Sequence, residues 1–203
     1  MPPLITIRGA TFDEVAPLFA ELDVDLTRRY GPGEPVHVDR AQFDLPGGAL
    51  LVAVELAAAA EDRATSLLGC VGVRHLPRPT GVDLVTGPIA ELKRMYVRPA
   101  VRRRGLAKTL LTAAEATARE LGYEHLWLET GLRQPAAVDL YRAAGYTPVA
   151  RFGQFAHESE SVYLGRPLGD GAGAPEASVT DVSCSPRSGA AVPRGDRPAS
   201  CRP

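Results

Sequence analysis

Hydrophobic residues follow two different spacings between residues 4 and 168. The β-branched or alternating pattern of strands occurs in residues 4–8, 49–56, 67–76, 91–97, 125–130 and 161–168. Apolar residues recur every three or four positions, as on one face of a helix, in residues 12–30, 106–121 and 135–144. Strands and helices therefore interleave, and the pattern predicts a single mixed α/β domain over residues 4–168.

Capping and turn residues set the expected boundaries of these elements. Thr11 and Glu14 have the spacing of a capping box at the start of the first helix, and a break in that helix is expected near Leu22. A polar turn near residues 61–65 is expected to join the second and third strands. Gly122 directly follows the second long helix and is expected to end it.

The composition of the chain changes after Leu168. Residues 169–203 contain no Leu, Ile, Met, Phe, Tyr or Trp and are rich in Gly, Pro and Ser. Such a segment cannot bury enough apolar surface to offset the conformational entropy that it would lose on ordering. We therefore expect residues 169–203 to form a disordered tail outside the domain.

Charge and composition argue against several classes of protein. The 203 residues include 23 basic and 24 acidic ones, so the chain as a whole lacks the positive charge of a nucleic-acid-binding protein. No apolar run is long enough to span a bilayer, and the N-terminus lacks the pattern of a signal peptide. The three cysteines are far apart, and the four histidines show no metal-ligand spacing. The sequence thus predicts a cytoplasmic protein with no metal, nucleic-acid or membrane partner.

A strand, a basic loop and a helix follow one another from residue 91 onward. In the strand ELKRMYV, simple alternation places Leu92, Arg94 and Tyr96 on one face, and Lys93, Met95 and Val97 on the other. Three arginines then stand directly before Gly105 and the helix. The first N–H groups of a helix have no partner inside it, and the helix dipole is positive there, so this end suits an anion. Arginines alone would be unfavourable at this end by about 0.3–1 kcal/mol each, and the run therefore indicates a bound phosphate or pyrophosphate.

This loop also carries a resemblance to a known family. VRPAVRRRGLA resembles the acyl-CoA-binding motif of the GCN5-related N-acetyltransferase (GNAT) superfamily, R/Q-x-x-G-x-G/A, which here reads Arg102-x-x-Gly105-x-Ala107. The strand before it, the helix after it, HLWLET and the later LYRAAGY (residues 140–146) also occur in the family's order. The resemblance covers residues 4–168 and implies a mixed, mostly antiparallel central sheet of about six to seven strands, flanked by about four helices.

The resemblance implies transfer of an acetyl group from acetyl-CoA directly to a primary amine of a small molecule or peptide. The residues that it assigns to the pyrophosphate are Arg102, Arg103, Arg104, Gly105, Leu106 and Ala107, with Lys108 beside them. Those assigned to the pantetheine arm and the oxyanion are Met95, Tyr96 and Val97. Many members also hold the arm with an asparagine; this chain contains none, and Gln134 is the amide nearest that place. Family members are often dimers, so a homodimer is one expected assembly.

The resemblance also implies an acid and a base. Tyr141 matches the family tyrosine that protonates the departing thiolate, and with a pKa near 10 it carries its proton at neutral pH. Glu91, at the head of ELKRMYV, is the expected base for the amine, and Glu129 is the second candidate. Tyr141 could instead be a core side chain, and Glu91 could be an ion-pair partner of Lys93 or Arg94.

Two other functions remain open at this point. A domain of this kind could bind an acyl-CoA as a non-catalytic sensor, although the presence of both Tyr141 and Glu91 favours turnover. The arginine run could bind nucleic acid, which the near-neutral charge disfavours. The acceptor cannot be named: Glu21, Asp23 and Asp25, in the region that selects it in the family, suit either a cationic amine or a solvated face.

A chain that ends at Leu168 should keep the melting temperature and the acetyl-CoA affinity of the full-length chain. The reason is that residues 169–203 have no large apolar side chain with which to pack on the domain. Thermal unfolding and isothermal titration of both chains measure this. A fall of several degrees in the melting temperature would show that the tail packs on the domain.

Overall fold

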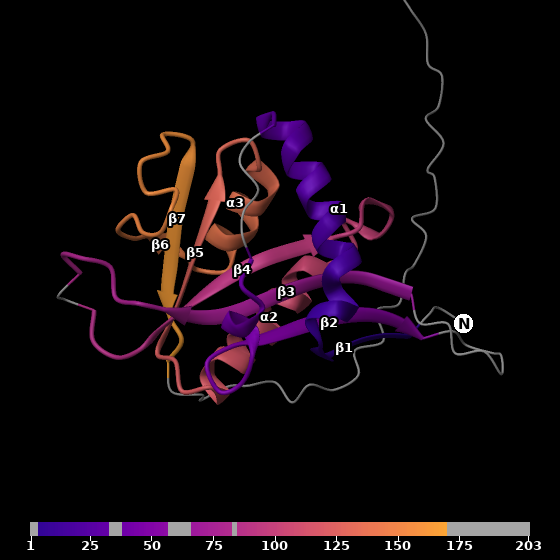
Figure 1. Ribbon diagram of the computed structural model, residues 1–203, viewed down its shortest axis with the longest axis horizontal. Helices are drawn as coiled ribbons and strands as arrows, with labels where there is room; N and C mark the ends of the chain where they lie inside the picture. The colour runs from indigo at the N-terminus through magenta and orange to yellow at the C-terminus, as the bar shows by residue number, and fades with distance from the viewer. Residues whose placement is uncertain (1–3, 33–37, 57–65, 83–84, 170–203) are drawn as a thin grey trace, which may run out of the picture.

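A seven-stranded sheet forms the centre of the protein (Figure 1). The computed structural model describes residues 4–32, 38–56, 66–82 and 85–169. In chain order the elements are β1 (Leu4–Ala10), α1 (Phe12–Tyr30), the short 3₁₀ helix η1 (Arg40–Phe43), β2 (Ala49–Leu56), β3 (Ser66–Leu76), β4 (Ile89–Val97), η2 (Pro99–Val101), α2 (Leu106–Glu120), β5 (His125–Gly131), α3 (Pro135–Ala143), β6 (Thr147–Pro148) and β7 (Ser161–Pro167). The strand order is β1-β2-β3-β4-β5-β7-β6, and only β4 and β5 pair in parallel. The mixed, mostly antiparallel sheet predicted from the sequence is confirmed.

Three α-helices, rather than about four, occur in the described residues, because α1 is continuous. The break expected near Leu22 is wrong: Leu22 is buried on the same apolar face as Leu18, so the helix continues to pack on the sheet. Thr11 caps α1 as predicted and accepts the Glu14 N–H at 3.3 Å. The expected turn at residues 61–65, and the tail from residue 170 onward, lie outside the described residues.

The helices cover the two faces of the sheet (Figure 1). On one face, Leu18 and Phe19 of α1 pack with β2 and with Phe43 of η1. On the other face, Leu110 of α2 and Tyr141 of α3 pack into the largest apolar cluster with residues from β2 to β7. None of the helices within the described ranges is long and apolar enough to cross a membrane.

β4 and β5 separate partway along their length. They are paired only from Ile89 opposite His125 to Leu92 opposite Leu128. β4 then continues to Val97 and β5 to Gly131 without pairing with each other. The edge of β4 from Lys93 to Val97 that faces β5 is therefore open, and its backbone groups are available to an extended ligand.

A β-bulge lies in the open part of β4. Lys93 pairs with Gly72 and Tyr96 with Cys70, so two residues of β4, Arg94 and Met95, stand opposite one residue of β3. Arg94 has a left-handed backbone with φ of 56°. The extra residue reverses the alternation beyond it, so the faces expected from simple alternation are wrong there. Leu92, Met95 and Val97 face the α2 side, and Tyr96 faces the α1 side.

Candidate active site

The loop between β4 and α2 presents a row of backbone donors. Arg103 and Gly105 have left-handed φ angles of 65° and 83°, a conformation that lets successive N–H groups point into one concavity. Within the described part of the chain, the N–H groups of residues 103–108 contact no protein acceptor, and the first bond of α2 runs from the Thr109 N–H to the Gly105 carbonyl at 3.1 Å. A Cβ added at Gly105 would meet no atom within 4 Å. The loop is thus open to a bulky anion such as a pyrophosphate.

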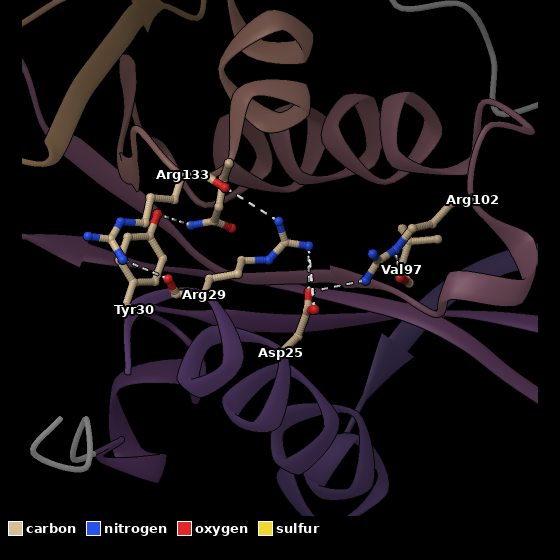
Figure 2. A network of polar contacts seen from close by, with 7 residues as sticks. Asp25, Arg29, Tyr30, Val97, Arg102 and Arg133 are labelled. Carbon is tan, nitrogen blue, oxygen red and sulfur yellow. Dashed lines mark hydrogen bonds and ion pairs between the residues drawn. The ribbon is translucent and has the colours of Figure 1, made fainter. Parts of the chain in front are cut away.

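Arg102, the first residue of the motif, is held by its neighbours (Figure 2). Its Nε donates to the Val97 carbonyl at 2.8 Å, and its Nη2 lies 3.3 Å from the Asp25 carboxylate. Its backbone N–H donates to the Pro99 carbonyl at 3.3 Å. Arg102 therefore fastens the loop to β4 and α1, and the row of open donors begins at Arg103, one residue later than expected from the motif.

The C-terminal end of α1 also contacts the loop after β5 (Figure 2). Arg29 lies 3.2 Å from Asp25, donates to the Arg133 carbonyl at 3.4 Å, and accepts from Arg133 through its own carbonyl at 2.9 Å. The Gln134 amide lies 3.5 Å from the Tyr30 hydroxyl. Through these bonds α1 joins the loops that follow the two separated strands.

Tyr141 lies beside the open edge of β4. Its hydroxyl is 3.5 Å from the Met95 sulfur, and the residue is 5% exposed. A thioether is a weak acceptor, so the phenol hydrogen remains available to a stronger one. Burial, and to a lesser extent the negative charge of Glu129, raise the pKa of Tyr141. The phenol therefore carries its proton at neutral pH and can act as an acid.

Glu91 and Glu129 line the same pocket but have different partners. Glu91 is almost fully buried and pairs with two cations, with one oxygen 2.6 Å from Arg74 and the other 3.1 Å from Lys93. Glu129 accepts the Ser161 hydroxyl at 2.8 Å. Burial raises the pKa of Glu129, and the Ser161 bond and the charge of Lys93 only partly oppose this. Glu91 is thus engaged by two cations, whereas the Ser161 hydroxyl is the one side-chain partner that Glu129 has among the described residues.

The acidic residues of α1 are neutralised by arginines. The pairs are Glu21–Arg98, Asp23–Arg94 and Asp25–Arg102. These carboxylates are therefore neither a purely solvated face nor a free site for a cationic amine, the two interpretations that the sequence left open. They bind α1 to β4 and to the residues that follow it.

Arg74, which lines the pocket from β3, was missed by the sequence analysis. No motif marks it, since it meets Glu91 only because β3 and β4 are adjacent. Phe152 and Phe155 line the pocket from the segment between β6 and β7. In the residues that the structure covers, no group of three or more His, Cys, Asp or Glu side chains is placed to hold a metal ion.

Comparisons with known proteins agree with this geometry. The model of the acetyltransferase (GNAT) family matches residues 19–146. The chain is 31% identical over 157 residues to an IAA acetyltransferase of Azospirillum brasilense, which covers 77% of this chain and 92% of that protein. The chain therefore belongs to the GNAT family of acetyltransferases.

Solved structures share the fold. A Klebsiella pneumoniae protein assigned as an acyl-CoA N-acyltransferase superimposes with a TM-score of 0.56 at 26% identity, over 83% of this chain and 99% of that one. Arabidopsis thaliana NAA60 in complex with acetyl-CoA gives a TM-score of 0.57 at 15% identity, over 80% of this chain and 98% of that one. Relatives of this fold thus bind acetyl-CoA.

Replacing Gly105 by Glu should abolish acetyl-CoA binding, because the side chain places bulk and negative charge at the open donors. Gly122→Glu is a matched control: Gly122 lies at the other end of α2, has φ of 84°, and a Cβ added there would also meet no atom within 4 Å. Both variants carry the same backbone strain of roughly 1–2 kcal/mol. Isothermal titration should detect a loss of affinity in the first variant alone, and equal affinities would contradict the phosphate-loop assignment.

Proposed function

We propose that the protein transfers the acetyl group of acetyl-CoA to an amine, directly and without a covalent enzyme intermediate. The observation that carries this proposal is the convergence of three features at the separation of β4 and β5. They are the open donors of residues 103–108, the buried phenol of Tyr141 and the carboxylate of Glu129. Acetyl-CoA supplies an activated thioester when it is bound, and the residues described below would hold it and move protons.

The donors of the loop and the open edge of β4 fit the two polar parts of acetyl-CoA. The N–H groups of residues 103–108 would hold the pyrophosphate, with Arg103, Arg104 and Lys108 exposed around them. The backbone of Met95, Tyr96 and Val97 would pair with the amide groups of the pantetheine arm, because β5 leaves this edge free. A backbone N–H of this segment would also hold the oxyanion of the tetrahedral intermediate. The Gln134 amide, at the mouth of the same gap, would add a polar contact to the arm.

Tyr141 would protonate the departing thiolate. Its hydroxyl reaches the open edge of β4 at Met95, its raised pKa keeps it protonated, and its weak contact with a sulfur is easily exchanged. A CoA thiolate sulfur bound near Met95 would therefore receive its proton from the Tyr141 hydroxyl, which already lies there.

Glu129 would accept the proton of the amine, directly or through a water molecule. The contacts favour it over Glu91, the base preferred from the sequence, because its pKa is raised and, among the described residues, it forms no ion pair, whereas Glu91 forms two. Glu91 would then be a positioning residue that holds Arg74 and Lys93 at the wall of the pocket. A non-catalytic sensor is the alternative function, and release of free CoA thiol on addition of amines distinguishes the two.

Replacing Tyr141 by Phe removes only the hydroxyl. Acetyl-CoA should still bind, while kcat falls by about 10²–10⁴-fold because the thiolate leaves without a proton. Tyr146→Phe is the control, since Tyr146 packs against Tyr141 but its hydroxyl donates to Glu115 at 3.1 Å. The control should unfold at a lower temperature and keep its kcat. Thiol release under saturating acetyl-CoA measures both rates, and equal rates for Tyr141→Phe and wild type would remove Tyr141 from the mechanism.

Replacing Glu129 by Gln should lower the rate at neutral pH, with part of the loss restored at higher pH, where more of the amine is already neutral. The same variant should be more stable than wild type at neutral pH. Because the folded state raises the pKa of Glu129, ionisation of this group destabilises the folded protein. The wild type therefore loses stability as the pH rises through that raised pKa. The gain should vanish well below pH 4.5, the ordinary pKa of the group.

Glu91→Gln provides the comparison for these measurements. It leaves Arg74 and Lys93 without their shared carboxylate, so its melting temperature should fall at neutral pH. A pH–rate profile for Glu91→Gln should keep the acidic limb of the wild type. If that limb disappears in Glu91→Gln and persists in Glu129→Gln, Glu91 is the base.

A further inference from the structure

We propose that the acceptor is a small amine that also carries an anionic group, of which an α-amino acid is the simplest, and that Lys93 binds the anion. This inference rests on the proposed acetyl transfer for its meaning, because it names the substrate class of the same site. It comes from the charges of one pocket and not from the fold.

The pocket lies on the α1 face, where β4 and β5 separate. Lys93 and Glu129 directly follow Leu92 and Leu128, the last paired residues of the two strands. They stand across the opening from each other, and the charge of Lys93 acts on Glu129. The carboxylate that would accept the proton of the amine therefore lies beside a cation. In an amino acid, the amine likewise lies beside a carboxylate.

Three cations and two carboxylates line the pocket, and one of the cations, Arg94, pairs with Asp23 of α1. The charged lining residues are Arg74, Lys93, Arg94, Glu91 and Glu129. Glu91 is the common partner of Arg74 and Lys93, so one negative charge serves two positive ones. Arg74 and Lys93 thus share a single carboxylate, and an anion in the pocket would complete the pairing.

Lys93 is the cation best placed to complete it. Its ammonium has three donors, and Glu91 at 3.1 Å is its only protein oxygen partner among the described residues. The side chain is 19% exposed and lies 6.0 Å from the centre of the Phe155 ring. Two of the three donors of Lys93 therefore remain for an anionic oxygen.

The apolar part of the pocket suits the rest of a small acceptor. Phe43, Phe152 and Phe155 form its other walls. A polyamine would instead bring several positive charges to a wall that already carries Arg74, Lys93 and Arg94. Glu21, Asp23 and Asp25 of α1, which could have attracted it, are paired with arginines. The structure therefore favours an anion-bearing amine over a polycation.

The test compares amino acids with their own carboxamides. We expect kcat/KM for alanine, valine and phenylalanine to exceed that of the matching carboxamide by about 10- to 100-fold, the effect of one charge-assisted contact. The amine of a carboxamide is less basic than that of the amino acid, so more of it is neutral and reactive at a given pH. This difference favours the carboxamides and therefore works against the expected result. Spermidine should be a poorer acceptor than any amino acid. A carboxamide or spermidine that reacts as well as the amino acids would overturn the assignment.

Lys93→Met tests the residue itself. It should remove the preference for the carboxylate by lowering kcat/KM for the amino acids and leaving that for the carboxamides within about threefold. Arg40→Met is the control, because it also removes one positive charge but lies outside the pocket and pairs with Asp13. Equal losses for amino acids and carboxamides in Lys93→Met would show a structural role only and overturn the assignment.

A binding measurement separates this inference from the proposed function. Amino acid and carboxamide are titrated into the protein saturated with CoA, which has no acetyl group to transfer. A preference for the amino acid that Lys93→Met abolishes, without thiol release from acetyl-CoA with any amine, would refute the transferase and support the anion site. Thiol release without such a preference in binding or rate would support the transferase and refute the anion site.

Discussion

The separation of β4 and β5 is the constraint on which the rest of this structure depends. Two parallel strands that stay paired would use each other's backbone groups, and the edge from Lys93 to Val97 would not be open. The separation also brings the loops after the two strands, and with them α2 and α3, to the two sides of one gap. Tyr141 reaches across that gap to Met95. The open edge of β4 and the positions of Tyr141 and Glu129 beside it are thus consequences of one interruption in the pairing of β4 and β5.

The bulge in β4 changes which face of the sheet the side chains of the strand point to. Before it, Glu91 and Lys93 face the pocket on the α1 side. After it, Met95 and Val97 face the α2 side, where Tyr141 lies. Without the extra residue, strict alternation would keep Met95 on the same face as Lys93, away from Tyr141. The left-handed backbone at Arg94 is the local cost of this change of face, and the Arg94–Asp23 ion pair and the contact of Arg94 with Phe19 hold the residue there.

Features that depend on residues close together in the chain could be predicted from the sequence, and features that depend on the pairing of strands could not. Strands and helices followed from periodicity, and the cap at Thr11 followed from residue types at fixed spacing. The bulge was not readable, because alternation in ELKRMYV looks regular and the register is set by β3. The partners of Glu91 were not readable either: Arg74 is its neighbour only because β3 and β4 are adjacent, with Arg74 directly opposite Glu91. The order of Glu91 and Glu129 as candidate bases changed for that reason.

The charges of the molecule fall into two groups, and the division marks the site. Glu21, Asp23 and Asp25 of α1 pair with arginines of β4 and the following residues and so dock the helix, and Asp25 also links Arg29 to Arg102. Two places are matched less completely in the described residues: the N–H groups of residues 103–108 have no protein acceptor, and Lys93 shares its one carboxylate with Arg74. Donors without acceptors cost a protein stability, which is tolerated where a ligand completes them. Both places call for negative charge, and they lie on the two sides of the gap between β4 and β5, one suited to a pyrophosphate and the other to the anion of an acceptor.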